Sequence, residues 1–314
     1  MPNLLKRIMQ FKICKTEINY KKLNPKNWKR PPFKKIIRGL AFFIIFLGAL
    51  IIVRDEYDYQ FGTYPYDFGD TAVEDSASED EMDCNVLGIE LHGDVVTYIT
   101  PESRDQEGNV VVDETSSEDI ISLINQAEND ENVKAIILEV DSYGGSAVAA
   151  EEINQALLKA SKPIVAFVRS AAASAAYWTA SGADIIFASS LSDIGSIGVT
   201  MSYLDNTKKN IKDGLTYNSL SIGKFKDYGN PDKPLTEDEK KLIMRDLNIT
   251  HNIFIKSVSE NRNLAIDKVR ALADGSSMPG QMALENGLID RIGGIYEVKS
   301  YLKDKLGEEI DICW

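Results

Sequence analysis

The residue whose type and setting best suit nucleophilic chemistry is Ser174. It lies in the run VAFVRSAAASAAYWTASGAD (165–184), where an apolar, partly β-branched stretch passes into an alanine-rich one. This pattern predicts a buried strand that feeds a tightly packed helix, with one hydroxyl near the turn. Because the chain has only two histidines, we expect a different base to activate this serine, and the candidate is Lys226.

Two glycines after an apolar run form a second candidate element. Gly144 and Gly145 follow residues 133–142, a largely apolar run that predicts a strand buried on both faces, and they precede a helical pattern. Glycines at such a turn let backbone N–H groups face an oxyanion at the start of a helix. The N–H of Ala175 is the candidate for a second donor to that oxyanion.

Each of these elements also has an ordinary structural explanation. The glycine pair can be a plain tight turn, Ser174 a small residue packed between helix and sheet, and Lys226 a solvated loop lysine. Taken one at a time, the structural explanations are favoured, because they are the common uses of these residue types. Only the combination of the elements favours catalysis.

The two histidines have no motif around them. His92 ends the first predicted strand, and His251 falls inside a long predicted helix. Catalytic triads are recognised by partnered geometry, so we interpret both as structural or surface residues. The chain has neither a phosphate-loop lysine motif nor a His-Glu-x-x-His motif, so we expect the catalytic reaction to need no metal and no nucleotide cofactor.

Strand-like and helical patterns alternate from residue 85 to residue 190. This alternation predicts an α/β fold with parallel strands. The predicted strands cover residues 85–95, 133–142, 162–170 and 184–189. The predicted helices cover residues 117–127, the second part of 143–160, and 170–183.

The pattern changes beyond Ser190. Residues 236–239, TEDE, form a capping box that opens a long helix. The elements predicted here are a glycine-punctuated loop at 192–199, a helix at 204–214, a strand at 216–223, the long helix to about Arg262, and a short helix at 267–273.

The N-terminal part of the chain predicts a membrane anchor. Residues 1–38 hold twelve Lys or Arg and one acid, whereas the whole chain has a net charge of −13. Residues 36–53 are apolar and, at about 1.5 Å per residue, span roughly 27 Å, close to the thickness of a bilayer core. The cations before this segment place the N-terminus in the cytoplasm. The acidic bulk disfavours nucleic-acid binding.

The resulting organisation has four parts: a basic cytoplasmic arm (1–35), a single transmembrane anchor (36–53), an acidic, aromatic linker (54–84) and an extracytoplasmic folded domain (85–314). The alternatives for the apolar segment are a buried core helix or a cleaved signal peptide. A core helix does not need so many preceding cations, and the segment ends in LIIVRDEYD without a small-x-small cleavage site.

The three cysteines show no metal-ligand spacing. Cys14 falls in the predicted cytoplasmic arm, where thiols stay reduced. Cys84 and Cys313 bracket the folded domain in an oxidising compartment, so they can form a disulfide or remain two free thiols.

Taken together, these elements resemble the signal peptide peptidases of the SppA type, a serine protease family with the ClpP/crotonase superfold. The resemblance covers about residues 85–298, and the predicted anchor also fits the family. Two departures from the family pattern stand out, since Ala175 and Ala176 replace a glycine pair and Tyr143 replaces a proline. The matching motifs, in chain order, are Ser142–Gly145, Ala172–Trp178, Gly195–Val199, Gly223–Asp227 and Ala283–Asp290.

The resemblance assigns a role to each candidate residue. Ser174 takes the place of the nucleophile and Lys226 that of the general base, since this lysine, unlike Lys224, precedes an aspartate. Ser196 matches the serine that orients the lysine. The oxyanion hole would be formed by the N–H groups of Gly144 or Gly145 and of Ala175.

The resemblance also implies fold, assembly and substrate. It implies stacked, parallel-rich sheets with flanking helices, and a ring-like homo-oligomer in which neighbouring protomers contribute the serine and the lysine. Substrates would be extended apolar peptides at the membrane, such as cleaved signal peptides. Two other functions stay open: an inactive membrane scaffold of the same fold, and an acyl-CoA enzyme of the crotonase type. The second is disfavoured because CoA esters are cytoplasmic.

Overall fold

A computed structural model of the chain describes residues 84–100, 103 and 113–314. The predicted basic arm (1–35), the predicted anchor (36–53) and the linker up to residue 83 lie outside the described residues. Among the helices of the described part, none has both the length and the apolar character needed to cross a bilayer.

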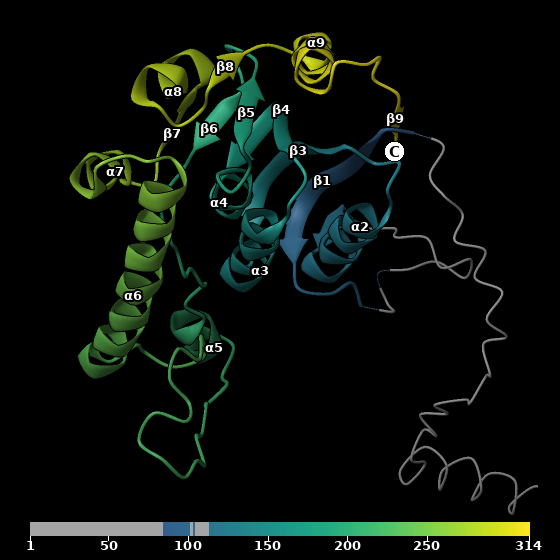
Figure 1. The fold of residues 1–314 in the computed structure, drawn as a ribbon. Coiled ribbons are helices and arrows are strands. Elements are labelled where there is room, and N and C mark those ends of the chain that lie inside the picture. Colours follow the sequence, from purple (N-terminus) through teal and green to yellow (C-terminus); the bar gives the residue numbers. More distant parts are fainter. Residues whose placement is uncertain (1–83, 101–102, 104–112) are drawn as a thin grey trace, which may run out of the picture. The chain divides into compact units, whose positions relative to one another are not determined.

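A mostly parallel β-sheet forms the centre of the folded domain (Figure 1). Its strands lie in the order β2-β1-β3-β4-β5-β8, with β9 beside β1. The prediction of parallel strands is confirmed. The strands of this path are β1 (Val86–Val96), β2 (Glu114–Ser116), β3 (Ala135–Gly145), β4 (Ile164–Ala173), β5 (Ile185–Ala188), β8 (Arg291–Ile292) and β9 (Ile312–Cys313).

Helices cover both faces of the sheet (Figure 1). The larger core lies on the face covered by α2, α3, α4 and α6, and α9 covers part of the opposite face with Val298 and Leu302. The helices are α2 (Ser117–Asn129), α3 (Ala147–Lys159), α4 (Ala175–Ala180), α5 (Thr207–Lys212), α6 (Glu237–Asn261), α7 (Ile266–Leu272), α8 (Gly280–Asn286) and α9 (Ile295–Leu306).

A short branch leaves the sheet at the end of β4. Strand β6 (Asp193–Gly195) pairs in parallel with Ala171–Ala173 of β4 and antiparallel with β7 (Ser277–Pro279). Where stacked sheets were expected, hydrogen bonds thus join the strands of the described residues into one sheet with a side branch. This parallel-rich α/β arrangement fits a ClpP/crotonase-like fold.

Three predicted elements differ from the structure, and the first is the loop predicted at 192–199, which contains β6 (Asp193–Gly195). The helix predicted at 170–183 begins only at Ala175, because Ala172 still pairs with both β3 and β6 and so remains in a strand. Residues 216–223, predicted as a strand, form no strand. Leu220 and Ile222 are exposed there, and no neighbouring strand supplies the ladder hydrogen bonds that a strand needs.

A disulfide between Cys84 and Cys313 closes the domain, with the two Cα atoms 5.9 Å apart. Asn85 strengthens this closure, because its side chain donates a hydrogen bond to the carbonyl of Glu309 and accepts one from the N–H of Asp311. The first and last strands of the described part are therefore joined both covalently and by hydrogen bonds.

We expect removal of this disulfide to destabilise the domain. Replacing Cys84 and Cys313 together with serine frees a loop of 229 residues in the unfolded chain, and should lower the free energy of unfolding by about 2–4 kcal/mol. Urea unfolding measures the change, with Cys14→Ser as the control. An unaltered unfolding midpoint in the double variant contradicts the expectation.

Helix α6 begins at the capping box predicted from the sequence. Thr236 Oγ1 accepts a hydrogen bond from the Glu239 N–H, and the Glu239 carboxylate accepts one from the Thr236 N–H at 2.8 Å. The ammonium of Lys233 lies 2.5 Å from the same carboxylate. Hydrogen bonds from Lys233 and from Thr236 lower the pKa of Glu239 to about 2.

The lowered pKa of Glu239 predicts a pH-dependent contribution to stability. The ionised carboxylate stabilises the fold above its ordinary pKa of 4.5, and this contribution is lost as the pH falls from 4.5 towards 2. Glu239→Gln should therefore be less stable than the wild type at pH 7, with the difference shrinking below pH 4.5. Thermal unfolding across this range tests it against Glu237→Gln, and a pH-independent difference would contradict it.

Candidate functional site

Ser174 sits at a strained turn between β4 and α4. Its φ is +52° and its ψ is −124°, and the only other non-glycine residues with positive φ in the described part are Ser196 and Asn263. The Ser174 N–H donates to the Gly195 carbonyl at 2.8 Å, and its carbonyl accepts from the Trp178 N–H at 3.0 Å. Backbone strain of this kind persists only where surrounding contacts enforce it, and it concentrates at functional sites.

Gly144 packs directly against this turn. Its φ is +115°, and a Cβ atom at this position would lie 2.9 Å from both the Ala175 nitrogen and the Ser174 Cβ. Only glycine therefore fits between the end of β3 and the start of α4. The predicted closeness of the glycine pair to Ser174 is thus present in the fold.

Ser142 fixes the conformation of the glycine turn. Its buried hydroxyl donates to the Gly93 carbonyl at 2.6 Å and accepts from the Gly144 N–H at 3.0 Å. Because that N–H already has a partner, Gly145 is the better candidate of the two glycines for an oxyanion donor. Gly145 is exposed and lines the same pocket as Ser174.

Ala175 adopts a helical conformation. It is the first residue of α4 and has no positive φ, so alanine carries no backbone penalty where the family pattern has glycine. N–H groups in the first turn of a helix have no partner within the helix. The Ala175 N–H is therefore placed to serve an oxyanion beside Ser174.

A pocket of about 380 Å³ opens beside Ser174. Much of its wall is apolar, and two of its rings, Trp178 and Phe254, stack with centroids 4.8 Å apart.

His251 also lines this pocket, although the sequence indicated a structural or surface residue. Its Nε2 atom is buried without a hydrogen-bond partner. The overlooked signal is helical spacing, since residue 251 shares a helix face with Phe254, Ile255 and Val258.

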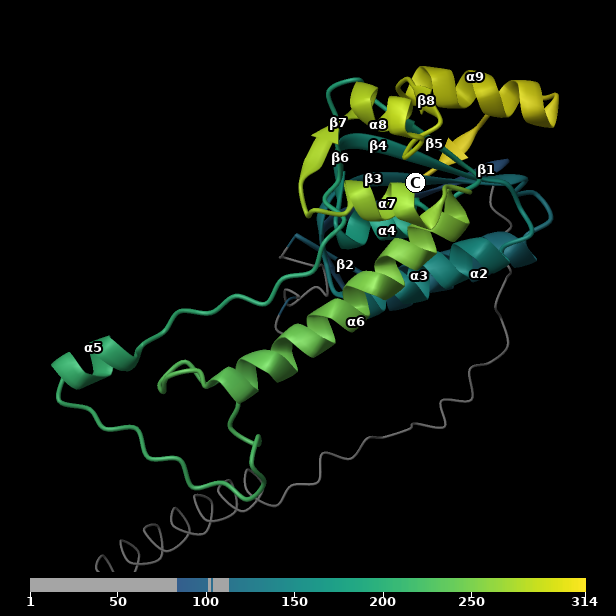
Figure 2. The same ribbon diagram turned by 90° about the vertical axis from the view of Figure 1, so that its left-hand side faces the viewer.

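Lys226 does not lie in this pocket. It is exposed, in the segment between α5 and α6 that extends away from the sheet (Figure 2). Ser196 does line the pocket, but its hydroxyl donates to the Gly275 carbonyl at 3.0 Å. A single protomer therefore brings Ser174, Ser196, Gly145 and Ala175 together and leaves the lysine apart.

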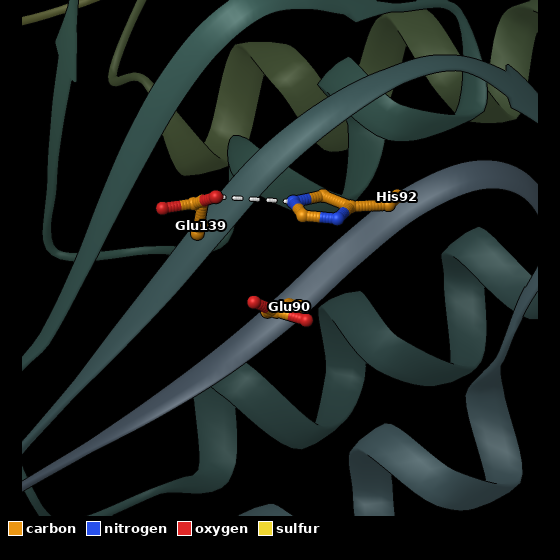
Figure 3. A group of neighbouring side chains, drawn as sticks. All are labelled: Glu90, His92 and Glu139. Atoms are coloured by element: carbon orange, nitrogen blue, oxygen red, sulfur yellow. Dashed lines mark hydrogen bonds and ion pairs between the residues drawn. The ribbon is translucent and has the colours of Figure 1, made fainter. Parts of the chain in front are cut away.

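A second group of titratable side chains lies elsewhere on the sheet (Figure 3). His92 Nε2 lies 3.1 Å from Glu139 Oε1, and Glu90 completes the group. Arg169 Nη1 donates to the same Glu139 oxygen at 2.9 Å, and this hydrogen bond raises the pKa of Arg169. His92 is therefore partnered on the sheet surface, and it does not line the pocket of Ser174.

The strained serine, the glycine turn and the pocket are the parts that a serine-hydrolase site needs. Peptidase family S49 matches residues 156–308. The chain is 36% identical over 175 residues to a protein of Methanocaldococcus jannaschii named as a protease, a match over 55% of this chain and 56% of that protein.

Two further relatives have more specific names. A protein of Enterococcus faecium named as a signal peptide peptidase SppA is 34% identical over 56% of this chain and 52% of its own length. Protease 4 of Haemophilus influenzae is 32% identical over 65% of this chain and 34% of its own length. The matched part thus spans about half or less of these relatives. Residues 156–308 thus match peptidase family S49, and the resemblance of the chain to SppA-type peptidases is confirmed.

The close packing of Gly144 against Ser174 predicts a large cost for any side chain there. Gly144→Ala combines the strain of a positive φ with backbone overlap, and should lower the free energy of unfolding by about 2–4 kcal/mol. Gly214 is the matched control, because its φ is +72° but nothing lies within 4 Å of an added Cβ. Gly214→Ala should cost only about 1 kcal/mol. Urea unfolding compares the two, and equal losses contradict the packing argument.

Proposed function

We propose that this protein is a membrane-anchored serine endopeptidase with a Ser174/Lys226 dyad. The observation that carries the proposal is the strained Ser174 in the lining of a pocket, with Gly145 and Ala175 lining the same pocket. Its substrates are extended apolar peptides near the membrane, and cleaved signal peptides are the first candidates. The relative named as a signal peptide peptidase supports this substrate class.

The proposed reaction is an acyl transfer to water. Neutral Lys226 takes the proton from Ser174 Oγ as the oxygen attacks a peptide carbonyl, and the two N–H groups stabilise the tetrahedral oxyanion. Lys226 then returns the proton to the leaving amine as the acyl-enzyme forms. Water, activated by the same lysine, releases the acyl group.

The lysine would come from a neighbouring protomer. Lys226 is exposed, with no ion-pair partner among the described residues, whereas Lys224 pairs with Asp238 at 2.9 Å. A lysine accepts a proton only in its neutral form, which burial against a neighbour's apolar pocket favours. Ser196 lies in that pocket, where its hydroxyl can orient the incoming amine.

An extracytoplasmic site is part of the proposal. Disulfides persist in oxidising compartments, so the bond between Cys84 and Cys313 supports a domain outside the cytoplasm. The basic residues before the apolar segment 36–53 support a cytoplasmic N-terminus.

The dyad predicts that two single substitutions abolish activity. Ser174→Ala and Lys226→Ala should each remove cleavage of an unstructured peptide by the full-length protein while leaving assembly intact. Lys224→Ala is the control and should retain activity. A fluorophosphonate probe should label Ser174, and failure to label it would support the alternative of an inactive scaffold. Full activity in Lys226→Ala would exclude the dyad.

Mixing the two inactive variants tests the shared site. If each site takes its serine from one protomer and its lysine from the next, a random 1:1 mixture restores about a quarter of the wild-type activity, because one site in four has both residues. Subunits must be exchanged or co-expressed before the assay. No recovery in verified mixed assemblies places both residues of each site in one protomer.

A further inference from the structure

The group formed by Glu90, His92 and Glu139 has the composition of a metal site. Its three donor atoms, one imidazole nitrogen and two carboxylate oxygens, lie within 4.8 Å of one another. They come from two neighbouring strands, β1 and β3, which hold them on one face of the sheet (Figure 3). We propose that these three side chains bind a zinc ion.

The strand register places two like charges against each other. Glu90 of β1 is directly opposite Glu139 of β3. Like charges in this arrangement destabilise a sheet unless a cation lies between them. The Glu139 side chain is only 11% exposed, so solvent screens its charge poorly. A divalent cation would satisfy both carboxylates at once.

The donor set favours zinc over calcium or magnesium. Imidazole nitrogen suits zinc and other transition metals, whereas calcium and magnesium prefer oxygen ligands alone. Three protein ligands leave a fourth tetrahedral position for water. His92 Nε2 and Glu139 Oε1 already lie 3.1 Å apart, close to the separation of two ligands on one zinc ion, so closing the site needs mainly a rotation of the exposed Glu90 side chain.

Arg169 competes for the same site. Its guanidinium donates to Glu139 Oε1 at 2.9 Å and occupies an oxygen that the zinc ion would bind. The Arg169 side chain is 54% exposed, so it can move into solvent at small cost. Zinc binding would therefore replace the ion pair between Arg169 and Glu139.

The site adjoins the turn that carries the glycine pair. His92 precedes Gly93, whose carbonyl accepts the hydrogen bond of Ser142, and Ser142 in turn holds the Gly144 N–H. Zinc bound by His92 would fix this end of β1 against β3. The proposal itself rests on the ligand geometry alone and does not depend on peptidase activity.

Titration of the metal-free full-length protein with zinc chloride, followed by calorimetry, tests the proposal. We expect one zinc ion per chain in the wild type, with affinity at least tenfold weaker in His92→Asn and in Glu90→Gln. His251→Asn, which changes the only other histidine of the chain, should bind zinc like the wild type. Thermal unfolding without zinc verifies that each variant is folded.

A variant of Arg169 tests whether this side chain competes with zinc. Arg169→Gln should bind zinc about two- to fivefold more tightly, the size of effect expected when an exposed ion pair is removed. Calcium chloride should give no comparable binding. A dissociation constant for zinc above about 1 mM in the wild type would overturn the proposal. So would wild-type zinc affinity in His92→Asn, or weaker zinc affinity in Arg169→Gln than in the wild type.

Discussion

The contact between the glycine turn of β3 and the strained turn at Ser174 is the constraint on which the candidate site depends. Strands β3 and β4 are parallel neighbours, so their carboxyl ends meet at one edge of the sheet. Gly144 fills the space between them, and no larger residue fits, because the Ala175 nitrogen and the Ser174 Cβ are in the way. The serine, two backbone N–H groups and the pocket gather around this contact.

Buried hydrogen bonds hold the glycine turn and the start of α4 in place. Ser142 joins the glycine turn to β1 through the Gly93 carbonyl, and Tyr177 in α4 is fully buried, with its hydroxyl donating to the Leu288 carbonyl at 2.9 Å. That burial raises the pKa of Tyr177 and keeps it neutral. Core packing and a hydrogen bond to a polar partner therefore hold both the glycine turn and the turn at Ser174. Such contacts are needed because a strained backbone conformation persists only where its surroundings enforce it.

The elements predicted correctly from the sequence are those that local residue patterns determine. The buried strands at 133–142 and 162–170 and the capping box at Thr236 depend on neighbouring residues, and all three are present. The helix predicted from residue 170 begins only at Ala175, because pairing with β3 and β6 keeps the preceding alanines extended although alanine favours helix locally. Helical spacing places His251 on the same face of α6 as Phe254, but its position beside Ser174 depends on packing between residues far apart in sequence.

Strand β1 also acts as a spacer of fixed length. It begins beside the disulfide of Cys84 and pairs along β3, with one register shift between His92 and Asp94, until Val95 lies opposite Gly145. At about 3.3 Å per residue, the candidate oxyanion turn is held roughly 30 Å from the point where the chain enters the domain. Hydrogen bonds between β1 and β3 fix the length of this strand, and the disulfide keeps its first residues paired with the sheet. The distance from the Cys84–Cys313 disulfide to the candidate site is therefore set by the length of one strand.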